Sequence, residues 1–170
     1  MYDAAPAFTS ARFFWRWVLL SVLLVAIDQA SKLSIAVVLP LHGQMAVTPF
    51  FNLVHALNPG AAFSFLAGAG GWQRHVLTVL GVLVSVGLMV LLQRGVHHRL
   101  EAFAYVCIIG GAMGNVLDRL RLGAVVDFLD VYWKTAHWPA FNLADVFIVI
   151  GVALILLSSF RSRTDPPKSN

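Results

Sequence analysis

The stretch FNLADVFIVIGVALILLSSF, residues 141–160, decides the fold class of this chain. It is long and apolar enough to cross a bilayer, since a spanning helix needs about 20 predominantly apolar residues. It nevertheless carries a carboxylate, Asp145, near its start. An acidic side chain at a membrane boundary generally has a partner or a function. The stretch therefore predicts a membrane protein in which Asp145 has a partner elsewhere in the chain.

The composition of the whole chain leads to the same class. Of its 170 residues, 59% are hydrophobic and only 12% are charged, whereas a soluble domain carries roughly 25% charged residues. Because this number of charges is too small to cover the surface of a soluble fold, we expect one membrane domain over residues 1–170. The net charge of +4 is small and the basic residues lie at segment ends, which argues against a nucleic-acid partner.

Four apolar segments are candidate membrane spans. They lie at residues 14–38, 76–92, 102–117 and 142–160, and a polar tail follows at 161–170. Backbone groups in hydrocarbon must find their hydrogen bonds within the segment, which makes each span a helix. The sequence predicts an all-α membrane fold with four transmembrane helices.

A long uncharged region separates the first two spans. Residues 33–73 contain no Asp, Glu, Lys or Arg, are rich in β-formers and are interrupted by the turn sequence Asn58-Pro59-Gly60. We interpret residues 41–68 as a small β-platform on the extracytoplasmic membrane surface. The alternative is an apolar connector without a role.

The basic residues predict the orientation. Seven of them flank the spans on one side and four on the other, and the more basic side is generally cytoplasmic. The seven are Arg12, Arg16, Arg94, Arg99, Arg161, Arg163 and Lys168; the four are Arg74, Arg119, Arg121 and Lys134. Both termini are therefore expected in the cytoplasm.

This orientation gives Asp145 a candidate partner. The third span runs outward and the fourth runs inward, so GNVLDRLRLGAVVDF (114–128) and FNLAD (141–145) meet the same outer boundary. Asp127 and Asp145 are then neighbours. Two carboxylates in a partly dry site share one proton, so that one accepts a proton from water while the other donates one. This pair predicts metal-free peptide hydrolysis by acid–base catalysis.

Structural roles remain open for the same side chains. Asn142 and Asp145 have the spacing of a helix capping box. Asp127 is equally suited to an ion pair with Arg119 or Arg121. Residue chemistry alone does not choose among these possibilities.

Further charged residues are candidates for the site. Asp118 and Asp130 are rival carboxylates, and Asp118 suits the orientation of a backbone group or of the neighbouring Arg119. Asp28 and Lys32 lie four residues apart in the first span, which predicts either mutual neutralisation or a polar lining for the site.

The segment GGAMGN (110–115) has the signature of close helix packing, because Gly110 and Gly114 lie four residues apart. Asn115 and Arg119 share one helical face. The six histidines are scattered without an HExxH motif, so no metal site is expected.

Five motifs occur in order along the chain: DQASK (28–32), NPGAAF (58–63), GNVLDR (114–119), GAVVDF (123–128) and FNLAD (141–145). With these motifs the chain resembles the bacterial lipoprotein signal peptidase family, the type II signal peptidases. The resemblance reaches from the first span to the last.

The resemblance implies an aspartic endopeptidase without cofactor, in the bacterial inner membrane, with its active site near the outer leaflet. It implies cleavage of prolipoprotein signal peptides just before a cysteine that carries diacylglyceryl. The catalytic residues by motif position are Asp127 and Asp145. The substrate-binding or site-orienting positions are Asn58, Gly60, Asn115, Arg119, Asn142, Asp28 and Lys32. Pro59 fills the variable place of an Asn-x-Gly motif, and a monomer in contact with lipid is expected.

Two other classes of function are alternatives to a peptidase. A small transporter or channel would use the acids as proton or ion sites, but the sequence has no internal repeat and its acids lie near one boundary rather than at the midplane. A membrane chaperone would grip signal peptides without cleaving them.

Overall fold

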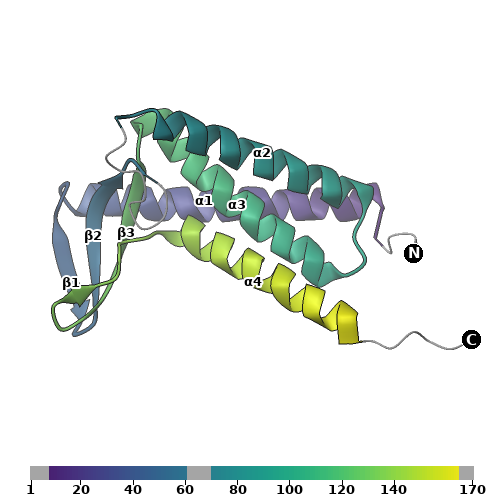
Figure 1. The fold of residues 1–170 in the computed structure, drawn as a ribbon. Coiled ribbons are helices and arrows are strands. Elements are labelled where there is room, and N and C mark those ends of the chain that lie inside the picture. Colours follow the sequence, from purple (N-terminus) through teal and green to yellow (C-terminus); the bar gives the residue numbers. More distant parts are fainter. Residues whose placement is uncertain (1–7, 61–69, 165–170) are drawn as a thin grey trace, which may run out of the picture.

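The computed structural model describes residues 8–60 and 70–164, which form a helix bundle with a small sheet at one end (Figure 1). The helices are α1 (Ala11–Val38), α2 (Gln73–Arg94), α3 (Arg99–Leu122) and α4 (Leu143–Thr164). The strands are β1 (Gln44–Thr48), β2 (Phe51–Asn58), β3 (Val125–Trp133) and β4 (Ala136–His137). The start of α1 and the end of α4 lie at the end of the bundle opposite the sheet.

Three described helices, α1, α2 and α3, are long and apolar enough to cross a membrane. The apolar part of α4, Leu143–Ser158, is shorter. Large apolar side chains point outward from the bundle, as in Leu19 of α1 and Leu83 of α2, which are 67% and 64% exposed. Exposure on this scale is expected of surfaces that face lipid rather than water, and the chain is a multi-pass membrane protein.

Helix α3 is the centre of the bundle, and small residues let its neighbours approach. A Cβ at Gly110 would lie 2.7 Å from Cβ of Leu24 in α1, and one at Gly111 would clash with the carbonyl oxygen of Ala144 in α4. Gly81 of α2 packs in the same way against Val116. The close packing expected from GGAMGN is therefore present, and it reaches three neighbouring helices.

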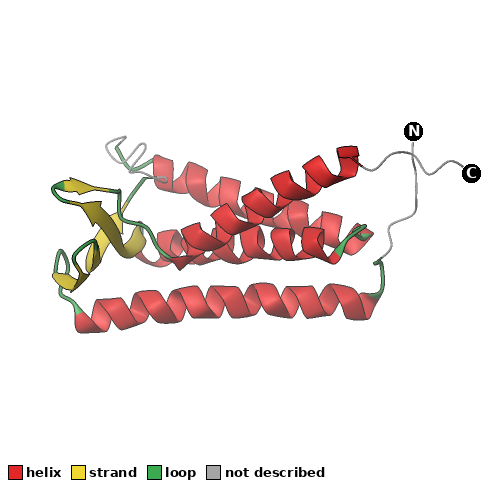
Figure 2. Ribbon diagram, turned by 90° about the horizontal axis from the view of Figure 1, so that it is seen from below, coloured by secondary structure: helices red, strands yellow, loops and turns green. Residues whose placement is uncertain are grey.

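The sheet is antiparallel with the order β1-β2-β3-β4. The expectation of a platform formed between the first two helices was incomplete, because β3 and β4 come from the connection between α3 and α4. Strand β3 pairs with β2 across the chain, placing Asp127 opposite Ala56. This pairing joins the α1–α2 connection to the α3–α4 connection beyond the helix ends (Figure 2).

The helices extend beyond the apolar cores of the expected spans. Most relevant to the site, α3 continues to Leu122, so Asp118, Arg119 and Arg121 lie on its last turns, beyond the end of the expected span at residue 117. Gly123 ends it in the left-handed conformation with φ 75°, where a residue without Cβ is favoured. Residues 61–68 of the expected β-region and 165–170 of the expected tail lie outside the described residues.

Candidate active site

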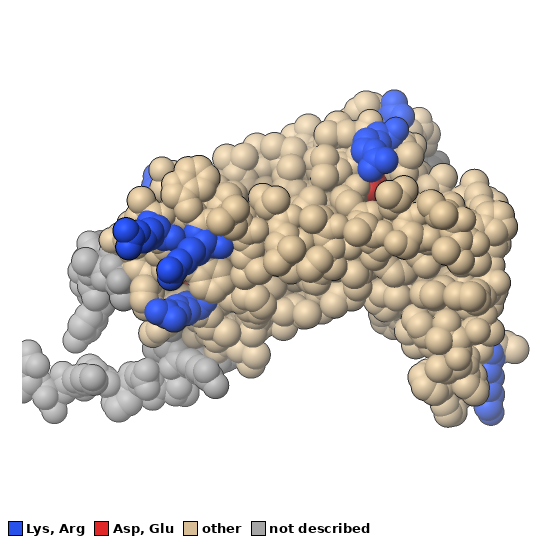
Figure 3. Space-filling view, turned by 180° about the vertical axis from the view of Figure 1, so that it is seen from behind, with Lys and Arg blue, Asp and Glu red and all other residues tan. Residues whose placement is uncertain are grey.

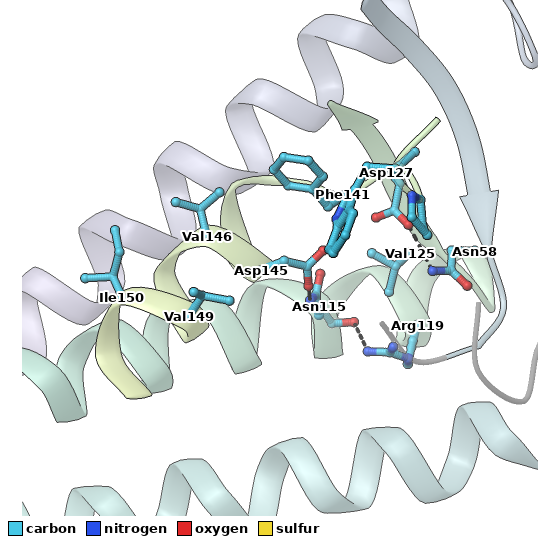
Figure 4. Close-up of a pocket in the computed structure, with 13 residues that line it drawn as sticks. Asn58, Asn115, Arg119, Val125, Asp127, Phe141, Asp145, Val146, Val149 and Ile150 are labelled. Atoms are coloured by element: carbon cyan, nitrogen blue, oxygen red, sulfur yellow. Dashed lines mark hydrogen bonds between the residues drawn. The ribbon is translucent and has the colours of Figure 1, made fainter. Parts of the chain in front are cut away.

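A cavity of about 380 Å³ opens where α3, α4 and the sheet meet (Figure 4). Asp127 enters it from β3 and Asp145 from α4, and Asn58, Asn115 and Arg119 supply further polar groups. The rest of its wall is mainly apolar. That part comprises Val125, Trp138, Pro139, Ala140, Phe141, Val146, Val149 and Ile150. Asp127 and Asp145 thus lie where the polar side chains of the cavity meet its apolar wall.

Asp145 lies in the first turn of α4, where it takes part in a capping box. Its backbone N–H donates to Oδ1 of Asn142 over 3.0 Å, and its Oδ2 accepts from the backbone N–H of Asn142 over 3.2 Å. The structural interpretation of FNLAD is therefore correct at this level. The other oxygen, Oδ1, accepts a 2.9 Å bond from Nδ2 of Asn115. Capping thus leaves Asp145 partly buried on the cavity wall rather than removing it from the site.

Asp127 is 3% exposed and lies in β3. Its two oxygens accept from Nδ2 of Asn58 over 2.9 Å and from Nδ2 of Asn142 over 2.7 Å. Asn142 therefore contacts both candidate acids. Burial, assisted by the negative charge of Asp145, raises the pKa of Asp127 to about 6, although the two amide hydrogen bonds oppose the shift. No ion pair joins Asp127 to Arg119 or Arg121 among the described side chains.

Arg119 faces the cavity from the last turns of α3. Its Nη2 donates to the carbonyl oxygen of Gly60 over 2.9 Å, and its Nη1 donates to that of Asn115 over 3.3 Å. Asn58 closes the Gly60 turn, since its Oδ1 accepts the Gly60 N–H over 2.9 Å. The Nε of Arg119 is buried without a hydrogen-bond partner among the described residues. One donor of this guanidinium is therefore unused at the site.

Asp28 and Lys32 lie behind the cavity, in a buried network between α1 and α3. The ammonium of Lys32 is 2.8 Å from Oδ2 of Asp28 and 2.9 Å from Oδ2 of Asp118. It also donates to Oδ1 of Asn115 over 2.9 Å. The expected mutual neutralisation is present, but it includes a second acid. Since Lys32 is only a donor, it fixes the Asn115 oxygen toward itself and the Asn115 amide N–H₂ toward Asp145.

The two rival carboxylates have other partners. Asp118 accepts from the backbone N–H of Val126 over 3.2 Å, as one of its expected roles requires, and its ion pair is with Lys32 rather than Arg119. Asp130 bonds to Nδ1 of His137 over 2.9 Å and accepts from Nδ2 of Asn52 over 2.8 Å. Neither lines the cavity that holds Asp127 and Asp145.

Two features of this region were absent from the sequence-based expectation. Gln29 donates to Oδ1 of Asp118 over 2.9 Å and so joins the buried network; its place inside DQASK was the available signal. The segment 138–140 forms a wall of the cavity, and only its position before FNLAD pointed to it.

A second apolar cavity, about 320 Å³, lies between α2 and α4 and shares part of the same polar group. Asn115, Arg119 and Asp145 line both cavities, as does Val149. Leu80 and Val84 form the α2 side of the second one. Two largely apolar cavities therefore meet at the polar side chains of Asn115, Arg119 and Asp145.

Known proteins are similar to this chain in sequence and in fold. Residues 20–161 match the family model described as signal peptidase (SPase) II. A lipoprotein signal peptidase of Aeromonas hydrophila is 57% identical over 150 residues, covering 86% of this chain and 89% of the relative. One of Shewanella amazonensis is 46% identical, with 91% and 92% covered. A solved bacterial membrane enzyme superposes with a TM-score of 0.81 at 26% identity, covering 93% of this chain and 95% of its own.

Proposed function

Because the chain belongs to the signal peptidase II family, and is therefore a membrane protease, we propose that it removes signal peptides from prolipoproteins as an aspartic endopeptidase. The cleaved bond precedes a cysteine that carries diacylglyceryl. The observation that supports this proposal most directly is that Asp127 and Asp145 line one cavity, with Asn142 bonded to both.

The two acids differ in their surroundings, and this difference suggests their roles. Asp127 is the more deeply buried and its pKa is raised to about 6 by burial, so it is the better holder of the shared proton. Asp145 is partly exposed to the cavity. We assign Asp145 as the base that takes a proton from water and Asp127 as the acid that protonates the scissile carbonyl.

The remaining polar residues hold this pair and the substrate. Asn58, Asn115 and Asn142 direct amide donors at the two acids. Arg119 has an unused buried N–H, which suits a carbonyl oxygen of the bound peptide. Gly60 keeps the guanidinium in place through its own carbonyl. Lys32 and Asp28 act through Asn115 and are positioning residues rather than catalytic ones.

The apolar walls fit a lipidated substrate. Val146, Val149 and Ile150 continue from Asp145 along one face of α4 (Figure 4). Acyl chains and a signal-peptide helix both require apolar surfaces that begin at the scissile bond. The two cavities that share Asn115, Arg119 and Asp145 offer two such surfaces.

The membrane placement follows from lengths and charges. At 1.5 Å per residue, the 22 residues of α4 are roughly 33 Å long, enough to cross a hydrocarbon core of about 30 Å. We propose four spans in one domain, a monomer in the bacterial inner membrane with both termini in the cytoplasm. The sheet and the acids then lie near the outer leaflet, where a lipidated precursor is anchored.

The decisive experiment incubates the purified protein in detergent with a precursor peptide that does or does not carry diacylglyceryl on its cysteine. We expect a new N-terminal cysteine only with the lipidated peptide, detected by mass spectrometry. Cleavage of both peptides at equal rates would contradict the assigned specificity. Tight binding without cleavage would favour a chaperone, and proton flux into vesicles without cleavage would favour a transporter.

A further inference from the structure

A polar cavity lies at the end of the molecule opposite the sheet, beside the start of α1. It has a volume of about 440 Å³ and is lined by three arginines from two helices: Arg12 and Arg16 of α1, and Arg99 of α3. Figure 3 shows basic side chains gathered at this end, whereas the acidic group visible in that view lies at the other end of the molecule. The proposed catalytic machinery does not use this cluster.

These three cations have no anionic partner among the described side chains. The ion pairs among the described side chains lie elsewhere in the molecule: Lys32 pairs with Asp28 and Asp118, and His137 pairs with Asp130. Glu101, the acid nearest in sequence to Arg99, already accepts from the backbone N–H of His97 and the hydroxyl of Tyr105.

The positions of the arginines add to the excess of positive charge. Arg12 lies in the first turn of α1, which has no acidic residue, and Arg99 is the first residue of α3. Helix N-termini carry partial positive charge and favour anions over cations. Arg12 and Arg16 are four residues apart, a spacing at which like charges repel. An anion bound in the cavity would relieve each of these repulsions.

The cavity is held in shape by contacts of its own. Phe8 exchanges two backbone hydrogen bonds with Val96, at 3.1 and 3.3 Å, and its ring stacks on Phe13 with centroids 5.0 Å apart. The guanidinium of Arg99 lies 5.6 Å from the centre of the Phe8 ring, a cation–π contact. Ser10 caps α1 through the N–H of Phe13. These contacts hold Arg99 beside the start of α1.

An apolar surface continues from the arginines along α1. Leu19 and Leu23 follow Arg16 at helical spacing and are 67% and 52% exposed. A phosphate group with attached acyl chains matches this order of surfaces, since the headgroup would meet the guanidiniums while the chains lie along the leucines. We propose that this cavity binds the phosphate headgroup of an anionic glycerophospholipid, in the leaflet at the terminal end of the bundle.

The test measures lipid binding to the purified full-length protein by native mass spectrometry. Phosphatidylglycerol and phosphatidylcholine with identical acyl chains are compared, and we expect tighter binding of phosphatidylglycerol. Arg12→Gln, Arg16→Gln and Arg99→Gln should each weaken that binding about fivefold, with little change for phosphatidylcholine. Arg94→Gln is the matched control, because it removes the same charge at the same end of the bundle without touching the cavity.

Equal affinity of the wild-type protein for the two lipids would overturn the proposal, and this comparison needs no variant. An equal loss with Arg94→Gln would show general attraction to the arginines at this end rather than a site. Binding of inorganic phosphate without preference for phosphatidylglycerol would replace the lipid by a free anion. A melting temperature equal to that of the wild type shows that a variant is folded.

Discussion

Two groups of acidic side chains lie within this protein, and they differ in what neutralises them. Asp28 and Asp118 share the ammonium of Lys32 at 2.8 and 2.9 Å, and all three side chains are nearly fully buried. Asp127 and Asp145 have amide donors at hydrogen-bond distance but no ion pair among the described side chains. The second pair also lines a cavity.

This difference distinguishes acids that stabilise the fold from acids that a ligand in the cavity can reach. A buried acid that is paired with a cation ties its neighbouring helices together, because breaking the pair would leave an unpaired charge in the interior. Asp127 has no such cation, and burial raises its pKa to about 6 although its amide hydrogen bonds oppose the shift. In this chain the first arrangement ties α1 to α3 and, through the bond from the Ala144 N–H to Asp28 at 2.9 Å, to the start of α4. The second arrangement remains open to a ligand.

The largest expected effect is on catalysis by the unpaired acids. Asp127→Asn or Asp145→Asn should reduce cleavage of the lipidated precursor by at least about a thousandfold, because each removes one partner of the proton exchange. The matched control is Asp130→Asn, a buried acid on the same strand with its own partners His137 and Asn52, which should keep most activity. Mass-spectrometric rates measure all three, and near-normal cleavage by either dyad variant would remove that residue from catalysis.

The next effect is on stability, through the paired acids. Lys32→Met leaves two buried carboxylates without a cation and should lower the free energy of unfolding by about 3–5 kcal/mol. Adding Asp28→Asn and Asp118→Asn to this variant should recover most of the melting temperature. It should not recover the rate of cleavage, because Asn115 would still lack the donor that fixes its amide.

This triple variant distinguishes a positioning role from a structural one. If stability and the rate of cleavage return together, Lys32 serves the fold alone. If stability returns while the rate stays about tenfold low, Lys32 also orients the amide that bonds Asp145.

The same contrast explains which parts of the molecule could be predicted from the sequence. The apolar helices and the capping box of Asn142 and Asp145 depend on local composition and spacing, so the sequence alone predicts them. The contact of Lys32 with Asp118 joins residues far apart in the chain, and no local pattern encodes it. The charges of Asp118 and Arg119 made α3 look shorter than it is, since Asp118 pairs with Lys32 of α1 and Arg119 donates to the Gly60 carbonyl, both far away in the sequence.

Strand β3 was missed for a related reason. The sequence VVDFLDVYW (125–133) is rich in β-formers, but its two aspartates made it look like a polar boundary loop. In the structure both acids are buried and bonded, Asp127 to Asn58 of β2 and Asp130 to Asn52 of β2. Amide side chains of the neighbouring strand therefore allow a strand with buried acids, and this pairing is visible only once the register is known.

The smallest effect concerns pH and follows from the raised pKa of Asp127. The folded protein holds a proton there up to about pH 6, whereas an unfolded aspartate releases its proton near its ordinary value of 3.8. The folded state binds more protons at Asp127 between these values, so the contribution of Asp127 to stability is most favourable below about pH 4 and is lost as the pH rises to about 6. The loss should be on the order of 2–3 kcal/mol. It is the expected consequence of burying an acid without a cation.

Melting temperatures of the wild type and Asp127→Asn, measured in detergent between pH 4 and 8, isolate this contribution. The substitution changes hydrogen bonds equally at every pH, so only the change of the difference with pH is diagnostic. The variant should gain on the wild type as the pH rises through 4 to 6, and the difference should level off above that range. A constant difference would mean that Asp127 ionises as it does in the unfolded chain, and the contrast between the two groups of acids would then rest on their access to the cavity alone.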